Sequence, residues 1–276
     1  MSALQQLMLG TSGALQFDIT IAADTTNYDL LAILIAAPHN YNNTSPANIT
    51  LTINSAVQVS STSTGTPALT TGAITSNAVL YIINTGSIKG KGGAGGAGGS
   101  VNYPSSTNPG SSGNQGGVAL NIASTLSGKV TITNGSGEIF GGGGGGGGGG
   151  CALFQGGGKD NGWAIGGAGG GGGAGTGAGA LGGVATGEDV NYNGLPGSSG
   201  TTSAGGAGGA QFCGNQCNGA GGAGGGFGAV GVVGGNGYSE DGGAAGGAGN
   251  AIALNGGSSP TFISGNDGTH VKGAVS

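Results

Sequence analysis

Short runs of alternating apolar and polar residues dominate the first part of the chain. The alternation is clearest in residues 16–22, where phenylalanine and isoleucines occupy every second position, and it recurs in 48–59 and 79–84. A period of two residues is typical of β-strands that bury one face. Serine, threonine, asparagine and glycine, which favour turns, separate the runs. The pattern therefore predicts a small, mostly β head over residues 1–89.

One apolar stretch in this head has no such alternation. Residues 29–37 are largely aliphatic, and Pro38 follows them. Asn27 can cap a short helix through this stretch, because asparagine is a favoured N-cap residue. The helix is expected to end before Pro38, since proline disfavours helical geometry in the residue that precedes it. We expect little other α-helix in the chain.

A short pattern of asparagine, glycine, a β-branched residue and a second glycine occurs three times. The three copies cover residues 84–90, 134–141 and 266–273. The second and third copies also share an upstream element, at 118–121 and 252–255. We interpret the copies as short β-turn-β repeats that bracket the glycine tracts, because the first two lead directly into glycine and the third closes the sequence.

The tracts between the repeats have a period of three residues. Glycine accounts for 75 of the 276 residues, about four times its ordinary share, while 7 prolines are too few for collagen. Small residues such as Ala94, Ala97 and Ser100 occupy every third position. A polyproline-II helix has three residues per turn, so such a row lies on one edge and leaves two edges of bare backbone.

Bare backbone edges allow close packing of neighbouring helices. Their N–H and C=O groups can then bond between segments, which provides the partners that buried backbone requires. A flexible linker would carry serine without a strict grid of larger residues. We therefore predict a glycine-rich domain of packed polyglycine-II helices over residues 90–276.

Charge and cysteine content restrict the possible partners. The chain has 5 basic residues, all lysine, against 10 acidic residues, and its net charge is −5. Without a basic run, nucleic-acid binding lacks its electrostatic driving force, so we expect no nucleic-acid partner. The three cysteines are interpreted as small buried thiols, with a bridge between Cys213 and Cys217 that would leave Cys151 free as the alternative.

Residue patterns typical of catalysis are missing from the sequence. The acidic doublets at 188–189 and 240–241 are adjacent residues, which point to opposite sides of an extended chain. A glycosidase needs two carboxyl groups that face each other across a sugar bond. The two histidines, His39 and His270, lie in unrelated contexts. We therefore expect no enzyme activity, no cofactor and no metal site.

Polar loops that contain aromatic residues interrupt the glycine tracts. Rigid scaffolds that present such loops are a common arrangement for recognition, and Tyr, Asn and Ser give contact area at low ordering cost. Aromatics that only cover the ends of the glycine helices are the alternative interpretation. The candidate receptor-binding residues are Tyr103, Lys159, Asp160, Trp163, Glu188, Asp189, Tyr192, Asn193, Phe212, Asn215, Gln216, Tyr238, Glu240 and Asp241.

Several stretches are similar to a known group of proteins. They are MSALQQLMLG at 1–10, FDITIAADTTNYDLL at 17–31, INTGSIKGKGGAGGAGG at 83–99, ALNGG at 253–257 and HVKGAVS at 270–276. With them the chain resembles the glycine-rich receptor-binding proteins at the tips of tailed-phage fibres. It also resembles, more loosely, the adhesins of T-even-type phages, whose tips are sandwiches of polyglycine-II helices joined by variable loops. The first 90 residues depart from the T-even adhesin head, so the mode of attachment is not carried over.

The resemblance implies a non-enzymatic adhesin on the virion, at the distal tail fibre or tail tip. Its expected partners are a bacterial outer-surface receptor, either a protein loop or a glycan, and a phage fibre or tail protein bound through residues 1–89. The mixed signs of the loop charges favour a protein loop or a neutral glycan. We also expect a homo-oligomer, with a trimer as the candidate state.

Two other functions fit part of the sequence. An ice-binding protein can be built from polyglycine-II helices, but it would have a flat face of regularly spaced small residues without charged aromatic loops. A glycine-alanine-rich bacterial surface protein would share the GGA repeats, but the helical head expected of that class is missing from residues 1–89.

Overall fold

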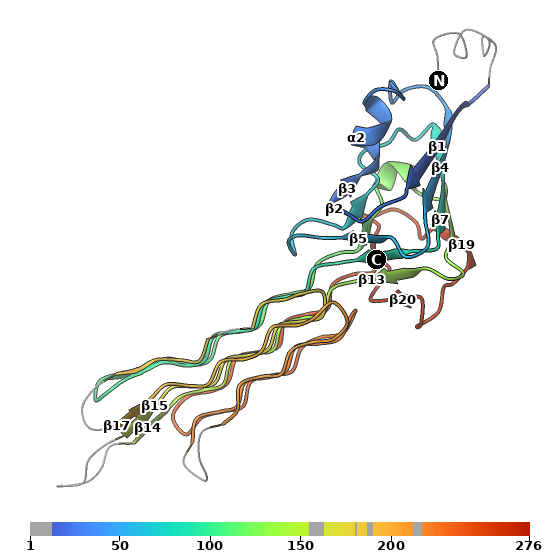
Figure 1. Ribbon diagram of the computed structural model, residues 1–276. Coiled ribbons are helices and arrows are strands. Elements are labelled where there is room, and N and C mark those ends of the chain that lie inside the picture. The colour runs from blue at the N-terminus through green and yellow to red at the C-terminus, as the bar shows by residue number, and fades with distance from the viewer. Residues whose placement is uncertain (1–12, 155–162, 180, 187–189, 212–216) are drawn as a thin grey trace, which may run out of the picture.

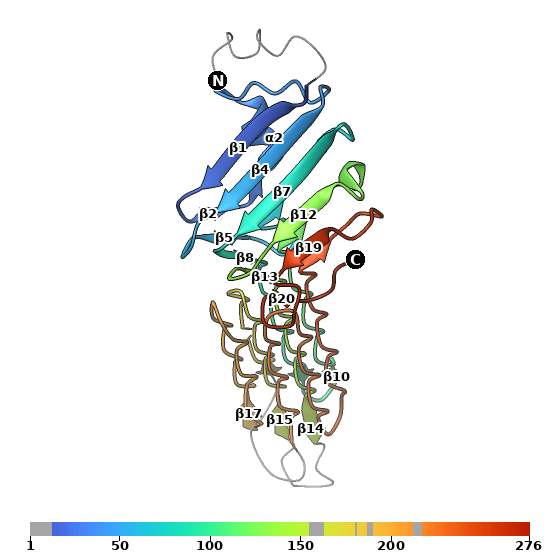
Figure 2. The same cartoon turned by 90° about the vertical axis from the view of Figure 1, so that its right-hand side faces the viewer.

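The computed structural model describes residues 13–154, 163–179, 181–186, 190–211 and 217–276. A β-rich head lies at the N-terminal end, and a long bundle of extended segments projects from it (Figures 1 and 2). The chain returns to the head at its C-terminus (Figure 1). In the described residues, no helix is long and apolar enough to cross a membrane.

Three parallel sheets build the head. The first contains, in order, β1 (Leu15–Ile21), β4 (Ala47–Ile53), β7 (Ala78–Asn84), β12 (Val130–Thr133) and β19 (Thr261–Ser264). The second contains β2 (Thr25–Thr26), β5 (Gln58–Ser60), β8 (Ser87–Lys89), β13 (Glu138–Phe140) and β20 (Val271–Lys272). The third contains β3 (Tyr28–Asp29), β6 (Leu69–Thr70), β11 (Leu120–Asn121) and β18 (Ile252–Ala253). Each of the first four circuits of the chain adds a strand to all three sheets, and the last adds one to the first and second sheets, so the circuits stack as coils of a parallel β-helix.

Inward-facing aliphatic residues form continuous rows through the stacked coils. In the first sheet, Ile19, Leu51, Ile82 and Ile132 are register partners on successive strands, and all four are buried. Their polar neighbours face outward, as the period of two predicts. The core of the head is therefore a stack of side chains along the axis of the β-helix.

The three β-turn-β repeats lie side by side in the second sheet. Ile88, Ile139 and Val271 are consecutive register partners on β8, β13 and β20. The shared upstream elements also lie side by side in the third sheet, but two residues out of step, because Ile252 pairs with Leu120 and not with its sequence equivalent Val118. The repeats therefore mark equivalent corners of successive coils.

The predicted helix forms, but its N-cap is not Asn27. Helix α2 runs over Leu30–Ile35, and the carboxylate of Asp29 accepts the backbone N–H of Ala32 at 3.2 Å. Asn27 instead adopts a φ of 50° and donates its side-chain amide to Thr62. Both residues can cap a helix, and the contact with Thr62, which is distant in sequence, decides between them.

Two long excursions leave the head between strands of the second and third sheets. Residues 90–119 separate β8 from β11, and residues 141–251 separate β13 from β18. All three sheets consequently take strands from both sides of residue 90. The boundary expected after residue 89 follows the composition of the chain, but the head in space also includes β11–β13 and β18–β20.

Ten consecutive glycines occupy the centre of the projecting bundle. The N–H groups of residues 142–150 donate in rotation to three neighbours, 111–117, 168–174 and 229–235, at 2.7–3.0 Å. Their carbonyls accept in rotation from three others, 93–99, 219–225 and 243–249. The central segment therefore has six bonded neighbours, and contact with each recurs every third residue.

This packing explains why the central residues are all glycine. A Cβ atom at any position of 141–150 would lie 1.9–2.2 Å from a carbonyl oxygen of a neighbouring segment. At the periphery, the larger members of the three-residue rows, such as Ala97, Ala207 and Val232, are exposed. Ala168 and Ala174 are exceptions, because both are fully buried.

Candidate functional site

Six short strands close the end of the bundle that lies farthest from the N-terminus (Figure 1). One small sheet joins β10 (Ser106–Thr107), β9 (Val101–Asn102) and β16 (Ala185–Thr186), and another joins β14 (Ala152–Phe154), β15 (Trp163–Ile165) and β17 (Val190–Tyr192). They enclose a second, small core made of Val101, Cys151, Ala164 and Ala185. We refer to these six strands and the turn 236–241 as the tip.

Aromatic side chains gather on the second of these sheets. Phe154 and Trp163 are opposite each other on β14 and β15, and their rings stack with centroids 5.5 Å apart and planes 13° apart. On the next strand Tyr192 pairs with Ile165 and is 43% exposed. Tyr103 packs against the small core. Large aromatic surfaces with partial exposure are typical of binding sites.

An acidic turn lies beside the two sheets. Residues 236–241 line a cavity of about 210 Å³. Ser239 Oγ accepts the backbone N–H of Leu153 at 2.8 Å, and Glu240 accepts the hydroxyl of Thr107 at 2.5 Å. These bonds fasten the turn to both sheets, while Tyr238 remains 58% exposed.

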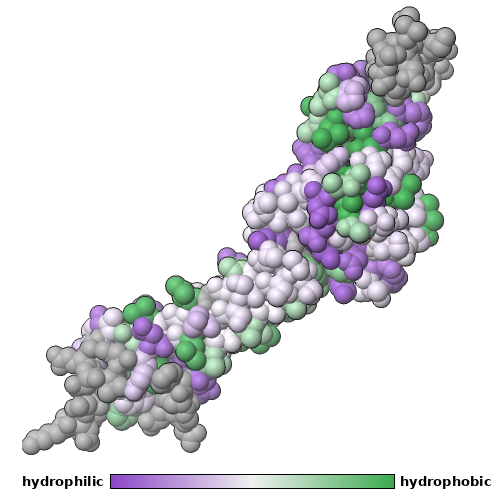
Figure 3. All heavy atoms as spheres, viewed as in Figure 1, coloured by the Kyte–Doolittle hydropathy of each residue, from purple (hydrophilic) through white to green (hydrophobic). Residues whose placement is uncertain are grey.

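The surface of the molecule changes along the bundle. Its middle part has residues of near-neutral hydropathy, and strongly hydrophilic and hydrophobic residues reappear toward the tip (Figure 3). Exposed apolar side chains in this part of the chain include Leu181, Val184 and Leu195. Larger exposed side chains therefore reappear at the tip, in addition to Val230, Val232 and Val233, which lie along the bundle.

The structure brings together the predicted candidates that it describes. They come from separate loops and are Tyr103, Trp163, Tyr192, Asn193, Tyr238, Glu240 and Asp241. Asn193 has a local structural contact, because its side-chain oxygen accepts the backbone N–H of Ala185 at 3.0 Å. The other candidates lie outside the described residues: Lys159, Asp160, Glu188, Asp189, Phe212, Asn215 and Gln216.

Sequence reasoning missed three residues that shape the tip. Phe154 forms half of the aromatic stack, Thr107 holds Glu240, and Ser239 holds the acidic turn. Phe154 is the first aromatic residue after the run of ten glycines and lies close to Trp163 in sequence, and this position could have identified it. The sequence around Thr107 and Ser239 gave no such indication, because their hydrogen-bond partners are distant in sequence.

The cysteines are not all free thiols, contrary to the preferred interpretation of the sequence. Cys217 is bonded in a disulfide, and Cys213 lies outside the described residues. Cys151 is a free, buried thiol whose pKa is raised, chiefly by burial and further by the charge of Glu240. A raised pKa keeps the thiol protonated and unreactive near neutral pH.

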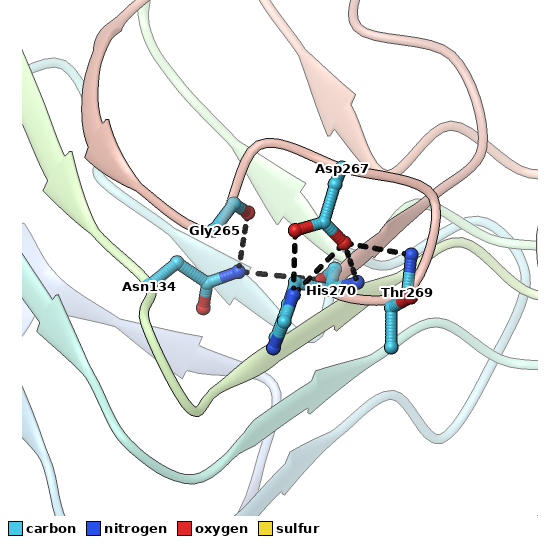
Figure 4. A network of polar contacts seen from close by, with 5 residues as sticks. All are labelled: Asn134, Gly265, Asp267, Thr269 and His270. Carbon is cyan, nitrogen blue, oxygen red and sulfur yellow. Dashed lines mark hydrogen bonds and ion pairs between the residues drawn. The ribbon is translucent and has the colours of Figure 1, made fainter.

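The histidine in the third repeat has a partner that the sequence analysis overlooked. Both carboxylate oxygens of Asp267 lie 2.9 Å from Nδ1 of His270 (Figure 4). The hydrogen bond from His270 is the main reason that the pKa of Asp267 is lowered. Asn134 donates to the backbone oxygens of Gly265 and His270 in the same network. The pair therefore fastens the last turn of the head.

Metal-ligating side chains are distributed singly or in pairs in the part of the chain that the structure describes. There, no three His, Cys, Asp or Glu side chains come together as a metal would need. The buried side-chain polar atoms of the described residues all have hydrogen-bond partners. The tip presents aromatic, amide, hydroxyl and carboxylate groups.

Comparison with models of protein families identifies relatives of the chain. The model of the family described as "Phage tail fibre adhesin Gp38" matches residues 16–275. The chain belongs to this family. As a Gp38-family adhesin it is a component of the phage tail fibre, and the resemblance inferred from the sequence is confirmed.

A solved structure supports the fold of this Gp38-family adhesin. It is the crystal structure of the gp37–gp38 adhesin tip complex of the long tail fibre of bacteriophage S16, with 24% sequence identity and a TM-score of 0.55. The similarity covers 98% of this chain and 86% of the other. No curated protein matches the sequence. The predicted mostly β fold with little helix is confirmed.

Proposed function

We propose that this Gp38-family adhesin binds a receptor on the bacterial surface through its tip and catalyses no reaction. The observation that carries the proposal is the convergence of aromatic and acidic side chains from separate loops at the end of the bundle. Trp163, Tyr192 and Tyr238 come from different loops, and the last two are largely exposed. Rigid scaffolds that present such loops are a frequent solution for recognition.

The bundle supplies the rigidity in this proposal. We propose that its segments are polyglycine-II helices, because bonds between neighbours recur every third residue and each central residue bonds in rotation. A lattice in which backbone groups are bonded on all sides resists bending. The loops are thereby held in fixed relative positions, which lowers the entropy lost on binding.

The head is the part that we assign to attachment. The solved relative is a complex of gp38 with gp37, and by analogy we propose that the head of this chain docks on a fibre protein. The docking unit is the whole β-helix, including β11–β13 and β18–β20. This arrangement would place the tip at the distal end of the fibre. A homo-oligomer stays a prediction.

The receptor class follows from the composition of the tip. Exposed tyrosines with amide, hydroxyl and carboxylate groups favour a protein loop or a neutral glycan. A strongly anionic polysaccharide would be repelled by Glu240 and Asp241 at close range.

Alanine replacement of single tip aromatics tests the proposal. Trp163→Ala, Tyr192→Ala and Tyr238→Ala are each expected to weaken binding of the purified protein to host cells roughly thirtyfold, or about 2 kcal/mol. Tyr81→Ala is the matched control, because Tyr81 lies on the outer face of the head and is 43% exposed, as is Tyr192. Unchanged melting temperatures would show that the variants fold.

Two results would overturn this assignment. One is wild-type affinity in all three tip variants. The other is an equal loss of cell binding in Tyr81→Ala, which would move recognition to the head.

A further inference from the structure

Three of the five lysines of the chain meet where the bundle leaves the head. Lys89 lies at the end of β8, Lys91 two residues later, and Lys272 at the end of β20. Nζ of Lys89 is 2.8 Å from Glu138, and it also lies 5.6 Å from the ring centroid of Phe227. Among the described residues, Glu138 is the one carboxylate that forms an ion pair with these lysines. Three lysines against one carboxylate give the junction excess positive charge, although the net charge of the protein is −5.

A cavity of about 110 Å³ opens beside these lysines. Its wall includes Ser60 and Lys89 from the head and Thr176, Thr202 and Phe227 from the bundle. The cavity has room for about three or four water molecules at roughly 30 Å³ each. A small tetrahedral ion fits this space.

The hydroxyl groups of the wall are available as donors. Nζ of Lys91 donates to Oγ1 of Thr176 at 2.7 Å, so the hydroxyl hydrogen of Thr176 must point elsewhere. Among the described residues, the side chains of Ser60 and Thr202 have no hydrogen-bond partner, and both line the cavity. Ammonium groups beside free hydroxyl donors match the needs of an oxyanion, because hydrogen bonds to a charged acceptor are the strong ones.

We propose that this junction cavity binds a tetrahedral oxyanion, namely phosphate or the phosphate group of an ester. Lys89 and the hydroxyls of Ser60, Thr176 and Thr202 hold it, and Lys91 supplies charge from the rim. An ester would direct its remaining part into solvent. The site lies at the opposite end of the bundle from the tip, so it does not depend on the receptor proposal.

Calorimetric titration of the full chain tests the site. Inorganic phosphate and glucose 6-phosphate are titrated separately at constant ionic strength, which holds general screening fixed. We expect saturable binding, weakened about tenfold or more in Lys91→Gln and in Ser60→Ala, because each removes a donor or charge from the site. Tighter binding of glucose 6-phosphate than of phosphate would assign the site to esters on a glycan, and equal binding would assign it to the free anion.

Lys129→Gln is the matched control. It removes the same charge at a turn of the head, where Lys129 donates to the carbonyl of Ser76 and is exposed. Affinity in this variant should stay within about twofold of the wild type. Lack of saturable binding of both probes to the wild type would overturn the proposal, as would an equal loss in Lys129→Gln.

Discussion

Replacement of Gly146 by alanine is expected to destabilise the bundle far more than the same replacement at Gly226. A Cβ atom at Gly146 would lie 2.0 Å from the carbonyl oxygen of Gly222, whereas ordinary contacts begin at 3.4 Å. The two segments would therefore have to separate by 3.4 − 2.0, or 1.4 Å. At Gly226 a Cβ meets no atom within 4 Å.

The separation would break backbone hydrogen bonds around Gly146. Gly222 donates to Gly147 at 2.8 Å between these two segments, and a separation of this size moves that bond beyond bonding distance. Overpacking costs about 1–3 kcal/mol, and a buried backbone group left without its partner costs about 1–3 kcal/mol more. The expected loss in the free energy of unfolding is therefore about 2–6 kcal/mol, or on the order of 10 °C in melting temperature.

Scanning calorimetry of the two alanine variants measures the difference. Gly226→Ala should stay within about 1 kcal/mol of the wild type, because an unhindered alanine restricts mainly the unfolded chain. A second pair extends the test to valine, since a Cβ at Gly95 would lie 2.1 Å from Gly170, while Ala97 is exposed. Equal melting temperatures within each pair would refute the close packing of bare backbone.

Three further predictions concern individual side chains. Asn134→Ala should lower the free energy of unfolding by about 1–3 kcal/mol in urea titration, because buried Asn84 loses a hydrogen-bond partner; an unchanged midpoint would contradict this. The lowered pKa of Asp267 means that its contribution is present above the unfolded value of about 3.9 and is lost as the pH falls through the folded pKa. The difference in melting temperature between Asp267→Asn and the wild type should therefore be largest near pH 6 and shrink as the pH falls below about 3.9. Because burial raises the pKa of Cys151, iodoacetamide should modify this thiol at pH 8 only after unfolding, and rapid labelling of the native protein would contradict its burial.

The long strands of the head could be predicted because their signal is local. Residues 16–22, 48–59 and 79–84 alternate over enough positions to reveal β1, β4, β5 and β7. The third sheet could not be found in this way, since each of its strands has two residues and depends on neighbours in other coils. The extent of the head depends on those strand pairings, and a change in amino-acid composition along the chain does not reveal them.

The register in which the strands pair was the second feature that the sequence could not predict. The repeats align Asn134 with Asn266 in sequence, but β12 and β19 pair Thr133 with Ser264 after a shift in register. Gly265 therefore follows opposite Asn134 and accepts its side-chain amide. A single irregular residue in a strand is enough to displace a sequence repeat from its structural equivalent.

The tip was predictable as a set of loops but not as a surface. Breaks in the three-residue period identified the loops that contain Trp163, Tyr192 and Tyr238. Which loops touch depends on the hydrogen bonds between distant glycine segments, as in the contact of Glu240 with Thr107. Their role in binding stays a prediction.

Exchange of the tip loops is the most direct test of receptor recognition by the tip. Residues 184–193 and 236–241 are replaced in the full-length protein by those of a relative that infects another host, and adsorption of phage carrying the chimera is measured on both hosts. Because the loops are held by the bundle and the head is unchanged, the account predicts that adsorption follows the loops to the new host. Adsorption that stays with the original host, in a chimera that melts like the wild type, would contradict recognition by the tip.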